Sequence, residues 1–175
     1  GWDLRKTVKL LAKSNAPLLE WLFSPVVYFE NEEFVSQMRS LAKVCFSPVA
    51  CLHHYLGTTK NFMDVCQAEE VKLKSYFYAL RTALAGKWII ENNSFPPVDF
   101  MELLPIAPQN IQEKVKELMV IKANQDEKYL HPKEDLITDF LLETVKFNQE
   151  NAVVLGSGKK MAVELDRVFR GMIKM

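Results

Sequence analysis

Three side chains with the chemistry to bind a polyphosphate follow one another at helical spacing. Lys74, Tyr78 and Arg81 stand at positions i, i+4 and i+7, so a helix places an ammonium, a phenol and a guanidinium on one face. Arginine offers phosphate oxygens a planar fork of donors, and lysine offers a mobile point charge. The competing interpretation is a solvated helix face whose cations pair with Glu69 or Glu70.

A second polar stripe precedes the first along the chain. Lys60 follows Gly57 by three residues and His53 by seven, which places these residues on one side of a helix. Two neighbouring helices can turn such stripes toward each other. We therefore predict that His53 and Lys60 lie on the opposite side of the same site.

Other arrangements of reactive residues do not have the spacing that their chemistry requires. The adjacent pair His53 and His54 diverges by about 100° on a helix, and no Asp, Glu or Cys stands four residues beyond either one, so we predict no metal site. Gly156-Ser157 followed by Glu164 and Asp166 superficially resembles the Gly-Ser and carboxylate signature of nucleotidyltransferases. Its spacing is too short, and a helix-to-helix turn is the better interpretation. No catalytic residue is predicted within this chain.

Polar caps and helix breakers divide the chain into predicted helices. Asp3, Asn31 and Ser47 have the side chains that accept hydrogen bonds from the first free amides of a helix, and Pro132 suits a first helical turn. Residues 26–29 are β-prone but isolated, so we expect an extended linker there. No segment shows the strict alternation of a half-buried strand. The chain is therefore predicted to be an all-α multi-helix bundle, with helices over residues 3–14, 16–23, 31–44, 47–65, 68–91, 99–104, 110–123, 133–153 and 159–173.

Composition indicates an ordinary globular protein. The chain has 175 residues, 49% of them hydrophobic, and its 22 basic residues balance 22 acidic ones. Any attraction for nucleic acid must therefore come from a local cluster of cations. The three cysteines lie among apolar neighbours and lack C-x-x-C spacing, so we expect buried, reduced thiols in a cytoplasmic protein. The start at Gly1 suggests a piece of a longer polypeptide.

Several strings in order resemble a known family. They are Trp2-Asp3-Leu4-Arg5-Lys6, Leu18-Leu19-Glu20-Trp21-Leu22-Phe23-Ser24-Pro25, Phe46-Ser47-Pro48, His53-His54-Tyr55-Leu56, Lys74-Ser75-Tyr76-Phe77-Tyr78-Ala79-Leu80-Arg81, Trp88 and Pro96-Pro97. Together they resemble the C-terminal helical region of predicted nucleotidyltransferases of the DNA polymerase beta superfamily, in the branch associated with RNA repair. The similarity covers roughly residues 1–100. We expect residues 1–95 to form the family-like helical region and residues 96–175 an extension packed on the same bundle, within one compact domain.

This resemblance implies an activity that needs a second, catalytic domain in addition to these helices. In the family, the Gly-Ser motif and the metal-binding carboxylates precede the Trp-Asp-Leu-Arg-Lys string, so the intact enzyme would hold Mg²⁺ there. It would transfer a nucleoside monophosphate from a nucleoside triphosphate to a hydroxyl acceptor, and RNA is a possible acceptor. The helices would close over the nucleotide, with Arg81 and Lys74 stabilising the triphosphate, Tyr78 orienting it, and His53 and Lys60 opposite.

A different class of function is compatible with the same sequence. The chain is then a non-catalytic helical module that interacts with a protein or with RNA. The zero net charge argues against strong generic RNA binding, because phosphate contacts need a local excess of cations. Binding of ATP and Mg²⁺ would favour the nucleotidyltransferase interpretation.

Overall fold

A computed structural model describes residues 3–156 of the chain. Helices make up most of this part, and the prediction of an all-α bundle is confirmed. Its elements in order are α1 (Leu4–Ala12), α2 (Ala16–Leu22), α3 (Glu32–Cys45), α4 (Pro48–Cys66), β1 (Glu70–Val71), α5 (Leu73–Asn92), α6 (Phe100–Leu103), the 3-10 turn η1 (Leu104–Ile106), α7 (Gln109–Ala123), β2 (His131–Pro132), α8 (Asp135–Asn151) and the 3-10 turn η2 (Ala152–Val154). The predicted helix over residues 159–173 lies outside the described residues.

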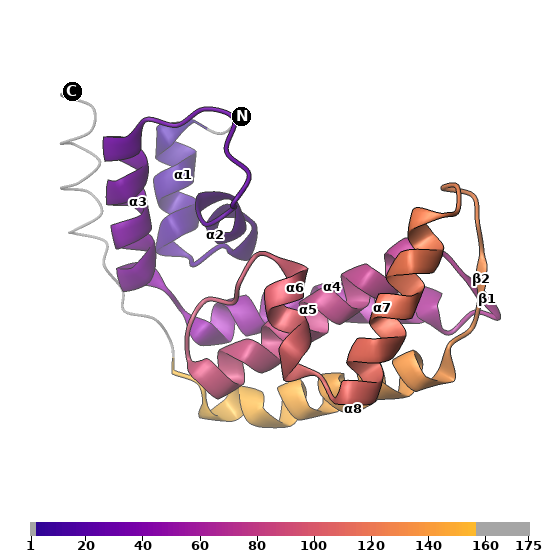
Figure 1. Ribbon diagram of the computed structural model, residues 1–175. Helices are drawn as coiled ribbons and strands as arrows, with labels where there is room; N and C mark the ends of the chain where they lie inside the picture. The colour runs from indigo at the N-terminus through magenta and orange to yellow at the C-terminus, as the bar shows by residue number, and fades with distance from the viewer. Residues whose placement is uncertain (1–2, 157–175) are drawn as a thin grey trace.

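The first three helices form a group at one end of the molecule (Figure 1). Each begins at a side-chain cap, because the oxygens of Asp3, Asn15 and Asn31 accept hydrogen bonds from the amides three residues later. Between α2 and α3, residues 26–29 form no strand. Tyr28 and Phe29 in this linker are almost fully exposed, as expected for a connection without a partner strand.

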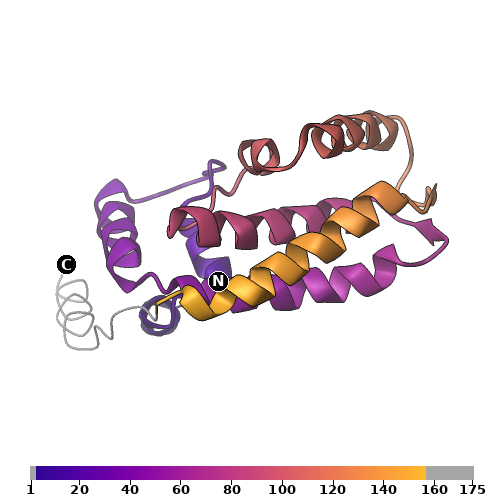
Figure 2. The ribbon, with the colours of Figure 1, turned by 90° about the horizontal axis from the view of Figure 1, so that it is seen from below.

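The long helices α4, α5 and α8 lie lengthwise beside one another, and α6 and α7 cover one side of them (Figures 1 and 2). The packed side of α5 carries the small residues Ala79, Ala83 and Gly86, all of them buried. Small side chains let neighbouring helices approach closely. At Gly86 the approach is so close that an added Cβ would lie 2.6 Å from Nδ2 of Asn148 on α8. This α5 helix is therefore the centre of the core.

Two short strands correct the predicted starts of two helices, α5 and α8. The helix expected from Ala68 begins at Leu73, because Glu70 and Val71 are extended and pair antiparallel with Pro132 and His131. The Val71 side chain is buried, and this burial of apolar surface stabilises the extended pairing. The position predicted for Pro132 in the first turn of a helix is also wrong, since Pro132 belongs to β2 and α8 begins at Asp135.

The remaining helices begin and end close to their predicted limits. At α6 the carboxylate of Asp99 accepts from the amide of Met101 at 2.8 Å. At α4 the hydroxyl of Ser47 accepts from the amide of Ala50, with Pro48 in the first turn. Within the described part of the chain, no helix has the length and apolar character needed to cross a bilayer.

Candidate functional site

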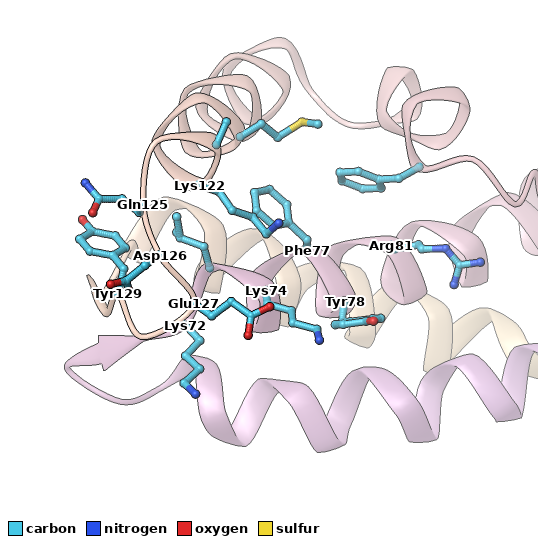
Figure 3. A pocket seen from close by; sticks show the side chains of 14 residues that line it. Lys72, Lys74, Phe77, Tyr78, Arg81, Lys122, Gln125, Asp126, Glu127 and Tyr129 are labelled. Atoms are coloured by element: carbon cyan, nitrogen blue, oxygen red, sulfur yellow. The ribbon is translucent and has the colours of Figure 1, made fainter.

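A pocket of about 660 Å³ opens between the first half of α5 and the end of α7 (Figure 3). The loop after α7 forms one wall, and Phe100 of α6 closes the far end. Four lining residues carry a cationic group, two carry a carboxylate, and four are aromatic. The lining consists of Lys72, Leu73, Lys74, Phe77, Tyr78, Arg81, Phe100, Met119, Lys122, Ala123, Gln125, Asp126, Glu127 and Tyr129.

The three residues of the predicted polyphosphate stripe all line this pocket. Lys74, Tyr78 and Arg81 follow one another along α5 (Figure 3). The Lys74 ammonium lies 5.7 Å from the centre of the Tyr78 ring, within the range of a cation–π interaction. Tyr78 is in turn stacked on Phe62 of α4, with ring centres 5.1 Å apart. Ring contacts therefore hold Lys74 and Tyr78 in position.

The second predicted stripe lies elsewhere. His53 and Lys60 are exposed residues of α4, and neither is among the residues that line the pocket. The structure thus brings Lys74, Tyr78 and Arg81 together and leaves His53 and Lys60 outside this concavity.

Arg81 is bound within the protein. One terminal nitrogen of its guanidinium donates to Oε1 of Glu20 at 2.8 Å, and its Nε donates to the carbonyl of Val98 at 3.4 Å. Glu20 belongs to α2 and also accepts from the hydroxyl of Tyr55 at 2.9 Å. Burial and then the Glu20 charge raise the pKa of Tyr55, so its hydroxyl stays protonated and continues to donate. The expected partners Glu69 and Glu70 are not those that Arg81 uses.

The lysines of the pocket are differently placed. Lys72, Lys74 and Lys122 are exposed, and none forms an ion pair with another residue of the range 3–156. Lys72 also caps the start of α5, where no acidic residue occupies the first turn. The partial positive charge of a helix start adds to that of the lysines. This end of the pocket is therefore a concentration of positive charge.

A hydrogen-bonded chain of side chains supports the wall opposite α5. The hydroxyl of Tyr129 lies 3.0 Å from Nδ1 of His131, and Nε2 of the same imidazole lies 2.9 Å from Oε1 of Glu134. Lys114 ends this series of contacts, because its ammonium lies 3.6 Å from the carboxylate of Glu134. A neutral imidazole that donates to Glu134 can accept from Tyr129. The Tyr129 ring is thereby fixed in the pocket wall.

Sequence spacing did not identify Lys72, Lys122, Phe100, Tyr129 or the role of Glu20. Lys72 lies two residues before Lys74, so within the predicted helix over residues 68–91 it would point to a different side from Lys74. The other residues come from separate elements, and only tertiary packing brings them to α5. Local periodicity contains no signal for such contacts.

A second pocket of about 560 Å³ differs in character. It lies between α2, α3 and the segment after α5, and its lining is mainly apolar, with aromatic rings of Phe23, Phe46, Trp88 and Phe95. It contains one lysine and two carboxylates. The pocket on α5 is therefore the better candidate for an anionic ligand.

Comparisons with known proteins give one family and one relative. The family described as the RNA repair pathway DNA polymerase beta family matches residues 1–171. The Bacillus subtilis (strain 168) protein called "Uncharacterized protein YcgL" is 37% identical over 178 residues, which cover 99% of this chain and 68% of that protein. No solved structure matches. The family match extends through nearly the whole chain, so the expectation that the similarity ends near residue 100 is wrong.

Proposed function

Because the chain belongs to the RNA repair pathway DNA polymerase beta family, we propose that it forms the helical, substrate-binding part of a nucleotidyltransferase. The intact enzyme would transfer a nucleoside monophosphate from a nucleoside triphosphate to a hydroxyl acceptor. One observation carries this proposal: the pocket on α5 combines aromatic side chains with three lysines that form no ion pair with any of the described residues.

The triphosphate would lie at the start of α5. Lys74 and Lys72 flank the first turn of this helix, and Lys122 approaches from α7. Hydrogen bonds from ammonium groups to phosphate oxygens are stronger than bonds between neutral groups. Tyr78 would orient the same phosphates from the next turn of α5.

Arg81 would contribute mainly by holding this wall of the pocket in position beside the nucleotide. Its guanidinium is held by Glu20 of α2 and by the carbonyl of Val98, and Arg81 is also one of the residues that line the pocket. One terminal nitrogen, Nη1, makes no hydrogen bond to any residue of the described range, and it could donate to a phosphate. His53 and Lys60 stay predictions for a surface that meets a catalytic domain.

The nucleoside would lie against the aromatic part of the pocket. Phe77 and Phe100 meet edge to face, with ring centres 6.3 Å apart, and Tyr129 of the loop after α7 also lines the pocket. A base stacked on an aromatic side chain gains about 1–3 kcal/mol. Stacking of this kind accepts every base, so this chain alone would discriminate weakly between nucleotides.

The Mg²⁺ ions of such a reaction need carboxylates that the described residues do not bring together. In the range 3–156, no group of three or more His, Cys, Asp or Glu side chains is arranged to hold a metal ion. We propose that the carboxylates belong to a catalytic domain. The part played by this chain is then to bind, orient and enclose the nucleotide.

Calorimetry with ATP and with inorganic triphosphate tests the phosphate site. Replacing Lys74 with Ala removes one charge-assisted hydrogen bond worth about 1.5–3 kcal/mol, so we expect both ligands to bind at least about tenfold more weakly. Lys116→Ala is the matched control, because Lys116 is an exposed lysine of α7 outside the pocket. Equal losses in the two variants would show that the ligands respond to overall charge alone.

A further inference from the structure

The helix α1 carries an exposed row of cations at the end of the molecule remote from the pocket (Figure 1). Arg5, Lys9 and Lys13 are spaced by four residues and are all exposed. Residues four apart lie about 6 Å from one another on one side of a helix. The segment 4–13 contains no acidic residue, although the whole chain has no net charge. The row is therefore a local concentration of positive charge.

Neighbouring residues leave this row unneutralised. Arg5, Lys9 and Lys13 form no ion pair within the part of the chain that the structure describes. The carboxylate of Asp3 accepts from the amide of Lys6 as the helix cap, and Glu20 of α2 is engaged by Arg81 and Tyr55. The charges of Arg5, Lys9 and Lys13 are thus available to a partner.

From this arrangement we infer that the outer face of α1 is a docking surface for the phosphate backbone of RNA. Several phosphates along a strand bind a row of cations cooperatively, with release of condensed counterions. The inference rests on the proposed function for the identity of the polyanion, because the matching family is described by an RNA repair pathway. The surface itself is separate from the pocket on α5.

The apolar side of α1 argues against a membrane as the partner. An amphipathic helix binds a bilayer by inserting its apolar side between lipids. In α1 that side already faces the protein, where Leu11 is fully buried and Val8 and Leu10 pack against the core. Only the cationic side is left to meet a partner, and it offers charge without an apolar anchor.

The test compares two triple variants of the full chain that lose the same charge. In the first, Arg5, Lys9 and Lys13 are replaced with Gln. In the control, Lys116, Lys128 and Lys146 are replaced with Gln; these are exposed lysines of α7, of the loop after it and of α8 that form no ion pair within residues 3–156. Glutamine has nearly the helix propensity of lysine and arginine, so both variants should fold. Circular dichroism verifies this.

RNA affinity is measured by fluorescence anisotropy with a labelled single-stranded RNA oligonucleotide at increasing KCl concentration. We expect the α1 variant to bind RNA at least about tenfold more weakly at low salt and the salt slope to fall by about two, since each lost phosphate contact removes about 0.7. The control variant should keep the affinity of the wild type. Calorimetry with ATP should give the same affinity for the α1 variant as for the wild type.

Several results would overturn the inference. These are equal losses in the two triple variants, absence of RNA binding by the wild type at low salt, or equally tight binding of anionic vesicles or of an acidic peptide. A variant with Lys72, Lys74 and Lys122 replaced with Gln separates the two sites. If it alone loses RNA, the pocket is the RNA site and α1 is not. Loss of ATP binding in that variant, with RNA binding intact, would support both proposals.

Discussion

Arg81 joins the pocket on α5 to the helix α2. Its ion pair with Glu20 is only about one-fifth exposed on either side, and Tyr55 donates to the same carboxylate oxygen. An ion pair shielded in this way stabilises a fold chiefly because removal of one partner leaves the other desolvated. Arg81 is therefore needed for the structure as well as for any ligand.

Replacing Arg81 with Ala should lower the free energy of unfolding by about 1–3 kcal/mol, because Glu20 loses a charged partner in a partly buried place. Urea denaturation measures the change. Lys74→Ala, at the other end of the same stripe, should change stability by no more than about 0.5 kcal/mol. Unaltered stability in Arg81→Ala, together with lost ATP binding, would mean that Arg81 contacts the nucleotide directly.

Spacing along the sequence placed Lys74, Tyr78 and Arg81 on one face of a helix, and the structure has them in one pocket. Spacing could not supply their partners. Glu20 is 61 residues from Arg81, and the loop with Tyr129 reaches α5 only through the fold. A periodic pattern reports which side chains share a face and carries no information about what packs against it.

The close packing of α5 on α8 depends on the absence of a side chain at Gly86. A Cβ there would lie 2.6 Å from Nδ2 of Asn148 and 3.1 Å from Cδ1 of Leu52. The Asn148 amide donates to the carbonyl of Ala83 at 2.9 Å, and this bond fixes α8 to α5. The buried glycine is therefore required in spite of its poor helix propensity.

Gly86→Ala should destabilise the protein by about 1–3 kcal/mol, since the tight contact must move and the bond to Ala83 is strained. Gly57→Ala is the matched control in the middle of α4, because nothing lies within 4 Å of its added Cβ. There the substitution should stabilise by about 0.5–1 kcal/mol. Thermal denaturation of the two variants would contradict this account if both shifts had the same sign.

At the level of elements, most helix starts were predictable because Asp3, Asn31 and Ser47 cap through local hydrogen bonds. The start of α5 was not. Extension of Glu70 and Val71 depends on pairing with residues 131–132, more than fifty positions later. Local propensity favoured a continuous helix, and a non-local backbone pairing overrode it.

Across the whole molecule the three cysteines are free and buried, as expected from their apolar neighbours. Burial raises the pKa of Cys51 to about 11 and that of Cys66 to about 11, against an ordinary value near 9. The Cys51 thiol also donates to the carbonyl of Ser14, which joins α4 to the segment between α1 and α2. Both thiols are neutral in the folded state at neutral pH.

These pKa values predict how stability depends on pH. The unfolded chain loses the thiol protons near pH 9 and the folded chain only near pH 11, so the contribution is fully present below pH 9 and falls as the pH rises toward 11. Urea denaturation at a series of alkaline pH values should show this decline. The variant with Cys51 and Cys66 replaced with Ala should decline less steeply; an identical slope would refute the assignment.

The short ladder of β1 and β2 determines which parts of the pocket can vary independently. Lys72 follows β1 directly, with Lys74 two residues later, and Tyr129 lies two residues before the first residue of β2. Because main-chain bonds hold these two ends together, exchange of Gln125 or Glu127 should leave Lys72 and Lys74 in place. Under the proposed function, we expect these two loop positions to set ligand preference while the lysine end of the pocket keeps its geometry.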